Sequence, residues 1–316
     1  MLAYIVRRTL MAIPLLFIIT VISFGMMQMA PGDPTALMMD PMIKKENLEA
    51  YKEAQGLNDN VVVQYVRWLG NMATGNFGES LIRQGVPVKD LILARLPNTL
   101  ILMVVSSVIA LVISIPLGVW SATKRNSITD YIITFISFLG IATPNFWIGL
   151  VLIMFLSVHL GWFPTGGVST LGGDFSLLDR LHHLVLPALV LATADMAGLT
   201  RYSRSSMLEV LRQDYIRTAK ANGFKNRTVI FKHGLRNGLI PIITILGLML
   251  PSFIGGSVIV ESIFAWPGVG LLFVEAAFQR DYPVIMAVVV IVATLVVIGN
   301  LLADVLYAIF DPRIEY

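Results

Sequence analysis

Long apolar runs dominate the sequence, and six of them have the length of a membrane-crossing helix. A hydrocarbon core of about 30 Å requires about 20 mostly apolar helical residues. The fourth run is the shortest and contains Pro187 and Asp195. The pattern predicts an all-α integral membrane protein with six transmembrane helices. These are Thr9–Ala30, Thr99–Ala122, Tyr131–Val158, Leu184–Leu199, Leu239–Val260 and Val284–Phe310.

A polar segment, residues 31–97, separates the first two predicted helices and begins at a turn-rich PGDP sequence. Further along, apolar residues recur at helical spacing, which indicates amphipathic helices. They are Val61, Val62, Tyr65, Val66, Leu69 and Met72. We interpret the segment as an external helical insertion. It either packs as a small cap on the membrane domain or also offers a docking surface to an external partner.

The chain therefore divides into three predicted parts. Residues 1–30 form an N-terminal cytoplasmic end and the first membrane helix, residues 31–97 form the extracellular insertion, and residues 98–316 form the transmembrane core. A cytoplasmic loop at about 201–236 belongs to that core. The first helix resembles a signal peptide because Arg7 and Arg8 precede it. Its length, and Pro31 directly after Ala30, favour a retained helix.

Composition agrees with a membrane location. The chain is 56% hydrophobic and 14% charged, whereas a soluble domain has about 25% charged residues. The absence of cysteine excludes a disulfide framework and any thiolate metal site. We expect the lipid bilayer, and not nucleic acid, to be the surrounding partner.

Basic residues lie mainly in alternate short loops, which sets the orientation because such loops stay in the cytoplasm. The remaining short loops carry only Arg180 and Arg280. Both termini are therefore predicted to be cytoplasmic. The bases are Arg7 and Arg8, then Lys124 and Arg125, then Arg201, Arg204, Arg212, Arg217, Lys220, Lys225, Arg227, Lys232 and Arg236.

The most basic loop also has the pattern of ordered helices. Good helix formers run from Ser205 to Asn222, Gly223 can end that helix by adopting a left-handed conformation, and a second short helix fits Asn226–Leu235. Three interpretations compete: a loop that only fixes topology, a lipid-binding basic patch, and a docking element for a cytoplasmic protein. Small residues and a fixed turn favour docking.

This loop resembles the EAA loop of ABC-transporter permeases, which carries the coupling helix. Its form, DYIRTAKANG from Asp214 to Gly223, is similar to that of the permeases for peptides and nickel, with Arg-Thr-Ala in place of Glu-Ala-Ala. Other stretches share the resemblance: PGDP (31–34), RLPNTL (95–100), TRYSRSSMLEVL (200–211), ESIFAWPGVG (261–270), RDYP (280–283) and DPRI (311–314).

The resemblance implies a type I ABC importer transmembrane fold in a bacterial-type plasma (inner) membrane. It also implies a heterodimer with a second, homologous permease, two ABC ATPase subunits that bind ATP and Mg²⁺, and an extracellular or periplasmic substrate-binding protein. The residues that would contact the ATPase are Asp214, Tyr215, Arg217, Thr218, Ala219, Lys220 and Gly223.

The sequence offers no site for chemistry of its own. It contains no G-x-x-x-x-G-K-[ST] phosphate loop. Its four histidines, His159, His182, His183 and His233, lack metal-ligand spacing, and we find no nucleophile–base–acid set. We therefore expect no catalytic residue, no metal site and no cofactor in this chain.

Three residues are candidates for the transport pathway or its gate. Asp195 lies within a membrane helix, where a charge is costly unless it faces water or a partner. Three alternatives stay open for Asp195: it lines a polar passage, it pairs with Arg201, or it is protonated. Glu261 and Trp266 flank a turn between the fifth and sixth helices. That turn is a connector, and the resemblance also places it near an outer gate.

The prediction is a permease subunit that forms half of an ATP-driven import pathway for di- or oligopeptides. A nickel or metal-chelate importer shares the same motifs. An ion-coupled secondary transporter would use the intramembrane Asp195 and Asp304, and a membrane receptor would use the external insertion without moving solute.

Overall fold

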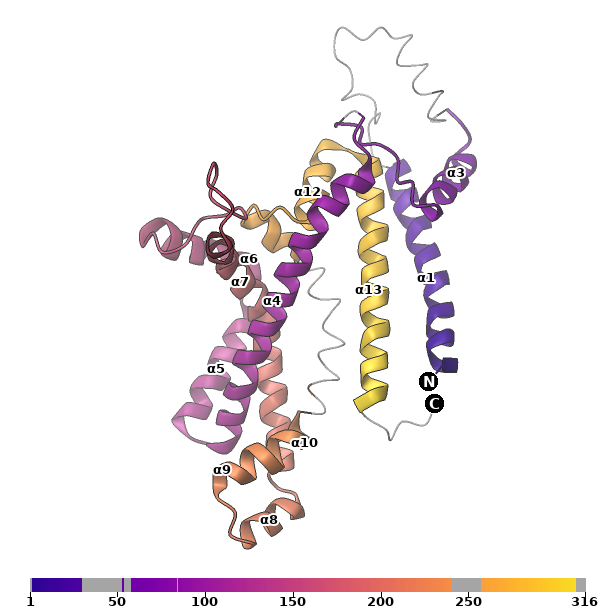
Figure 1. Cartoon of the computed structure of the whole chain (residues 1–316). Coiled ribbons are helices and arrows are strands. Elements are labelled where there is room, and N and C mark those ends of the chain that lie inside the picture. The colour runs from indigo at the N-terminus through magenta and orange to yellow at the C-terminus, as the bar shows by residue number, and fades with distance from the viewer. Residues whose placement is uncertain are drawn as a thin grey trace. The chain divides into compact units, whose positions relative to one another are not determined.

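The computed structural model describes residues 2–29, 53, 58–83, 85–239, 242 and 257–310, with side chains at 6–29, 53, 58–83, 85–239, 242 and 257–301. The chain forms two compact units. One, the α7 unit, comprises Thr99–Trp266 and Gly299–Tyr316 with Met1. The other, the α12 unit, comprises Leu2–Asn98 and Pro267–Ile298. Figure 1 labels the helices.

The α12 unit is built from α1 (Leu2–Met29), α3 (Val61–Ala73), α12 (Val269–Gln279) and the first parts of α4 (Val88–Thr123) and α13 (Tyr282–Phe310). Its apolar core joins α4, α12 and α13. The buried members are Val88, Ile92, Val269, Leu272, Ala276, Val284, Ala287 and Val288. These residues recur every three or four positions, as expected for helices that bury one face.

Hydrogen bonds and ion pairs attach the segment before α4, residues 80–83, to the rest of this unit. Ser80 donates a hydrogen bond to the carboxylate of Asp281, and the Leu81 N–H donates to the same group at 3.1 Å. Glu275 lies between two arginines, 3.4 Å from Arg83 and 3.6 Å from Arg95. This segment of the predicted insertion is thus fixed to the α12–α13 turn.

The α7 unit contains the second part of α4, α5 (Ile128–Ala142), α6 (Asn145–Leu152), the π-helical η2 (Ile153–His159) and α7 (Leu177–Val210). Helices α5 and α7 lie side by side (Figure 1). Gly118 of α4 permits a close approach to α7, because a Cβ there would lie 2.4 Å from Ser203 Cβ. The unit also holds α8 (Asp214–Ala221), α9 (Asn226–Thr228), η3 (Val229–Leu235) and α10 (Arg236–Gly238).

Within the described residues, four helices are long and apolar enough to cross a membrane: Val6–Met29, Val88–Thr123, Leu177–Val210 and Tyr282–Leu301. They correspond to the first, second, fourth and sixth predicted helices. The second begins at Val88 and the fourth at Leu177, both earlier than predicted. Their first turns are polar, so hydrophobicity alone did not indicate that these turns belong to a membrane helix. The fifth predicted helix, Leu239–Val260, lies mostly outside the described residues, so the count of six stays a prediction.

The third predicted helix, Tyr131–Val158, is not continuous. Ile128–Ala142 and Asn145–His159 meet at an angle of 104°. Thr143, with φ −95° and ψ 125°, is extended at the bend. Pro144 follows it, and a proline disfavours the helical conformation of the residue before it. The predicted helix is therefore broken at this proline.

Candidate coupling surface and pathway residues

The loop after α7 is a pair of short helical segments, but the first does not run unbroken from Ser205 to Asn222 as predicted. Helix α7 ends at Val210, and α8 starts at Asp214. The backbone between them tightens, since the N–H of Gln213 bonds the carbonyl of Val210 at 3.1 Å. Gln213 is extended, with ψ 151°. The break turns α8 away from the α7 axis.

Gly223 ends α8 as the sequence predicts. Its φ is +76°, a left-handed conformation that favours glycine. The N–H of Gly223 bonds the carbonyl of Lys220 at 3.0 Å, and that of Phe224 bonds the carbonyl of Ala219 at 3.3 Å. These two bonds constitute a Schellman motif, which satisfies carbonyls at the helix end. The turn is therefore defined by hydrogen bonds as well as by the glycine.

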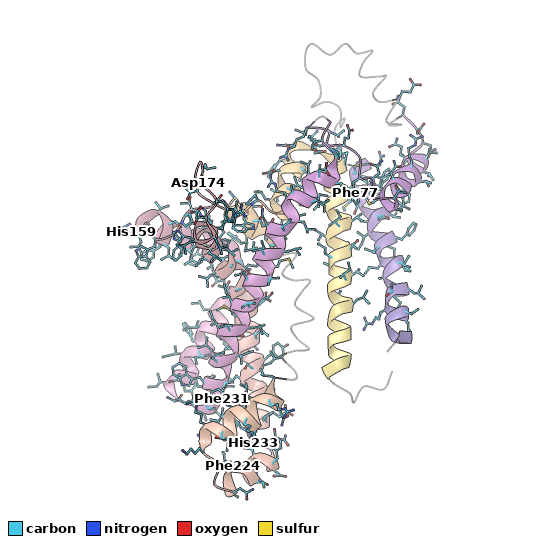
Figure 2. The ribbon with its side chains drawn as sticks, in the orientation of Figure 1. Phe77, His159, Asp174, Phe224, Phe231 and His233 are labelled. Atoms are coloured by element: carbon cyan, nitrogen blue, oxygen red, sulfur yellow. The ribbon has the colours of Figure 1, made fainter. Side chains whose placement is uncertain are left out.

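The inward face of α8 packs within the loop itself. Ile216 and Ala219 are buried against Val229 of η3. Ala219 therefore lies under η3, where its small side chain fits. Tyr215 accepts a hydrogen bond through its hydroxyl from Asn237 Nδ2 at 2.9 Å. Figure 2 shows Phe224 and His233 near each other, with ring centroids 5.5 Å apart.

The outward face of α8 is polar and accessible. Asp214, Arg217, Thr218 and Lys220 are exposed. Arg217 and Asp214 form a 3.3 Å ion pair with both side chains largely in solvent, and such pairs contribute little to stability. Five more bases of the loop are exposed: Arg212, Lys225, Arg227, Lys232 and Arg236. The loop therefore presents polar and mainly basic groups on a packed apolar base.

The second helical segment starts at Asn226, as predicted, and continues to Gly238 through the π-helical η3. It packs on α7 through glycines one helical repeat apart. A Cβ at Gly238 would lie 2.7 Å from Met207 Sδ, and one at Gly234 would lie 3.3 Å from Met207 Cε. Ser206 also donates a hydrogen bond to the Gly238 carbonyl at 2.9 Å. These contacts attach the loop to the end of α7.

One buried ion pair at this end of the unit was missed in the sequence. Asp130 of α5 is 2% exposed and receives two hydrogen bonds from Arg204 of α7, at 2.7 and 2.8 Å. Ser121 of α4 also donates to Asp130, and so does the Asn126 N–H at 3.0 Å. The sequence did contain one indication of this site: an acidic residue three positions after Ser127, which is the spacing of a helix-capping box.

A groove of about 510 Å³ adjoins this ion pair. Its lining comes from the α4–α5 turn and the end of α7, including Arg125, Arg204, Glu209 and Arg212. Basic groups thus extend from the groove to α8.

The structure places two of the three pathway candidates together. Glu261 is fully buried and accepts a hydrogen bond from Thr99 of α4 at 2.8 Å. The Trp266 N–H bonds the Glu261 carbonyl at 2.8 Å, and Trp266 is itself buried. Phe264 lies between them in the chain, and its carbonyl accepts the Gly167 N–H at 2.8 Å. These hydrogen bonds hold the turn in place, so it is an ordered connector, as predicted.

Asp195 lies on α7 and is half-buried. The residue suggested as its partner, Arg201, has its guanidinium 4.9 Å from the ring centroid of Phe138. The side chain of Asp304 lies outside the described residues. Over the described ranges, no cluster of three or more His, Asp or Glu residues has the geometry to hold a metal ion.

Comparison with known families and proteins agrees along the whole chain. The family described as binding-protein-dependent transport system inner membrane component matches residues 114–316, and its N-terminal counterpart matches residues 1–103. The oligopeptide transport system permease protein AppB of Bacillus subtilis (strain 168) is 67% identical over 316 residues, with 100% of each chain covered.

Two further relatives also match over their full length. The di/tripeptide transport system permease protein DppB of Pseudomonas aeruginosa (strain UCBPP-PA14) is 40% identical over 340 residues, covering 100% of this chain and 99% of the relative. The glutathione transport system permease protein GsiC of Escherichia coli (strain K12) is 38% identical over 316 residues, covering 100% of both.

Among solved structures, a chain of the inward-facing MetNI methionine ABC transporter is similar in fold. The TM-score is 0.56 at 18% identity, covering 70% of this chain and 96% of that one. Helical architecture, membrane-spanning length and family matches lead to one conclusion. The chain belongs to the binding-protein-dependent transport system inner membrane components, and it is a multi-pass permease subunit of an ABC importer.

Proposed function

We propose that this chain forms half of the membrane pathway of an importer for di- or oligopeptides. The observation that carries the substrate class is the identity of 67% over the full chain to an oligopeptide permease. Relatives named for di- or tripeptides and for glutathione, itself a tripeptide, support the same class.

The exposed face of α8 is the proposed contact with a separate ATPase. Asp214, Tyr215, Arg217, Thr218 and Lys220 supply the contacting groups, all of them exposed. Ala219 and Gly223 have a different part in this proposal: Ala219 packs α8 on η3, and Gly223 fixes the turn that follows. Because its apolar face packs on η3, α8 would move together with η3 as one rigid unit.

The proposed orientation places this loop, the α4–α5 turn and both termini in the cytoplasm, because the bases gather there. ATP and Mg²⁺ would then be held by two ATPase subunits, and hydrolysis would take place on them. A second, homologous permease would supply the other half of the pathway. A binding protein would deliver the peptide from outside, where the Glu261–Trp266 turn lies in this orientation.

Alternating access is the proposed mechanism. An ATPase pair shifts the permease between inward- and outward-open states only if it interacts differently with the two states. The α8 surface is where that difference in free energy would enter. Helix packing then transmits the shift, because packed interfaces have discrete arrangements. Asp195 is a proposed lining residue of the pathway, and Glu261 and Trp266 are proposed to shape its outer mouth.

Uptake by the assembled transporter in phospholipid vesicles tests the proposal. The complex contains this chain, its partner permease, the ATPases and the binding protein, and we expect ATP-dependent accumulation of a labelled tripeptide. Accumulation of a nickel chelate but not of the peptide would change the assigned substrate from peptide to metal chelate. Uptake that does not depend on ATP and is abolished by a proton ionophore would overturn the assignment as an ATP-driven importer in favour of an ion-coupled transporter.

A further inference from the structure

Helix α3 has three chemically distinct faces. At about 100° of rotation per residue, Val62, Val66, Leu69 and Ala73 form one apolar stripe. Tyr65, Trp68 and Met72 form a second, and Gln64, Arg67 and Asn71 form a polar third. The polar stripe lies about 160° around the helix from the Val62 stripe. The Tyr65 stripe lies between them on one side.

The Tyr65 stripe packs on α1, which crosses the membrane. The Tyr65 ring lies 6.3 Å from Phe17 and 5.3 Å from Phe24, and the Trp68 ring lies 5.8 Å from Phe24. The Tyr65 hydroxyl is 2.9 Å from that of Thr20. Figure 1 shows α3 against the C-terminal half of α1. One side of α3 is therefore already occupied by protein.

These contacts also give the depth of α3 along α1. Gln28 lies one residue before the end of α1 at Met29, and its amide bonds Gln64 of the polar stripe at 3.0 Å. Thr20, which meets Tyr65, lies eight residues earlier, or about 12 Å further into the membrane. The polar stripe is thus tied to the boundary of the bilayer, and the aromatic stripe reaches toward its interior.

The Val62 stripe is apolar and accessible. Val62 is 67% exposed and Val66 is 61% exposed, and Ala73 is exposed as well. A helix at a membrane boundary with its polar face toward water has its opposite face toward the acyl chains. Tyr and Trp are also the residues enriched at this depth. Elsewhere on α1, Ile22 and Met26 are also apolar and accessible.

We propose that α3 lies in the membrane interface, and that acyl chains of the leaflet at the C-terminal end of α1 cover its Val62–Val66–Leu69–Ala73 stripe. In the proposed orientation this is the outer leaflet. The binding protein or bulk water then meets only the Gln64–Arg67–Asn71 stripe. The proposal depends on α1 crossing the bilayer and not on the identity of the substrate.

Site-directed spin labelling tests this directly, because the chain has no cysteine of its own. Single variants V62C, V66C and A73C each carry a nitroxide in the assembled transporter, reconstituted in phospholipid vesicles. The matched control is N71C on the same helix. Power saturation measures collisions with oxygen, which concentrates in lipid, and with a water-soluble nickel chelate.

We expect V62C, V66C and A73C to collide more with oxygen than with the chelate, by several-fold relative to N71C, and N71C to show the reverse. High chelate collision at Val62 and Val66 would mean that the stripe faces water. Low collision with both reagents would mean that protein covers it. Either outcome overturns the proposal. Peptide uptake by the same variants is measured separately, so failure of transport is distinguishable from failure of the membrane placement.

Discussion

Arg204 of α7 holds Asp130 of α5 through two parallel hydrogen bonds of 2.7 and 2.8 Å, while Ser121 of α4 bonds the same carboxylate. Three helices of the α7 unit therefore meet at one buried charge. Arginine suits this position, because its planar guanidinium matches a carboxylate with two bonds. The pair lies less than two helical turns before the end of α7.

Replacement of Asp130 by asparagine is expected to destabilise the protein. It leaves the guanidinium of Arg204 without its counter-charge, at a cost of about 2–3 kcal/mol. Thermal unfolding of the purified transporter in detergent, followed by light scattering or intrinsic fluorescence, is expected to show a midpoint several degrees lower.

The matched variant R204K keeps the charge but loses the paired geometry, so its loss is expected to be smaller than that of D130N. A control, R217K, changes an exposed ion pair and is expected to leave the midpoint unchanged. If D130N unfolds at the wild-type temperature, the three-helix junction does not stabilise the unit.

Valine at Gly223 is expected to uncouple transport from ATP hydrolysis. A β-branched residue at φ +76° is strained by about 1–3 kcal/mol, which would disrupt the Schellman turn after α8. We expect peptide uptake to fall by about fivefold or more while the variant remains in the membrane and ATP hydrolysis continues. Both rates are measured in the same vesicles.

Two variants serve as controls for Gly223→Val. G223N is expected to retain more uptake, because asparagine tolerates the left-handed conformation. G172V introduces the same strain, at φ +76° and also in open space, but in the loop before α7. Normal uptake by G223V, or equal losses in G223V and G172V, would contradict a special role of the α8 turn.

Alanine at Gly118 is expected to prevent close packing of α4 and α7. Its Cβ would lie 2.4 Å from Ser203 Cβ and 2.8 Å from the Thr200 carbonyl oxygen, so backbone must move, at a cost of about 1–3 kcal/mol or more. The amount of folded protein in membranes and its unfolding midpoint are both expected to fall. G198A, where a Cβ meets nothing within 4 Å, is the control and is expected to be harmless.

Cysteine at Asn226 is expected to react with a membrane-impermeant thiol reagent only from the cytoplasmic side. The comparison is L171C, at a side chain that is 99% exposed in the loop before α7, which is expected to react from outside in intact cells. Because the chain has no cysteine of its own, the label found on each purified variant chain comes from one site. Reaction of N226C in intact cells would reverse the proposed topology.

Hydrophobic patterning predicted most of the described membrane helices but not their ends. The start of α4 carries Lys89, Asp90 and Arg95, so its first three turns do not look like a membrane segment. They are helical because α4 packs Val88 and Ile92 on α12 and α13. The bend after Ala142 was readable from Pro144 alone, since its effect on the preceding residue is local.

In the loop after α7, the glycine turn followed from the sequence, whereas the packing of Ala219 did not. Local chemistry determines Gly223, but a small residue is equally compatible with an interface inside the loop and one with a partner. The structure adds the contact of Ala219 with Val229 inside the loop. Asp130 was missed for the same reason: its partner is 74 residues away, a pairing that no local pattern reveals.

The π-helical turn of η3 has a consequence for insertions and deletions. A π-helix holds one more residue per turn than an α-helix of the same span. The wider turn absorbs the surplus residue, so loss of one residue from Val229–Leu235 would restore ordinary α-helical winding and leave Arg236–Gly238 at nearly the same angular position. A residue gained or lost without such a change of winding would instead turn Gly238 by about 100° away from Met207. The π-helical turn therefore lets this segment hold one more residue while both Gly234 and Gly238 still pack on Met207.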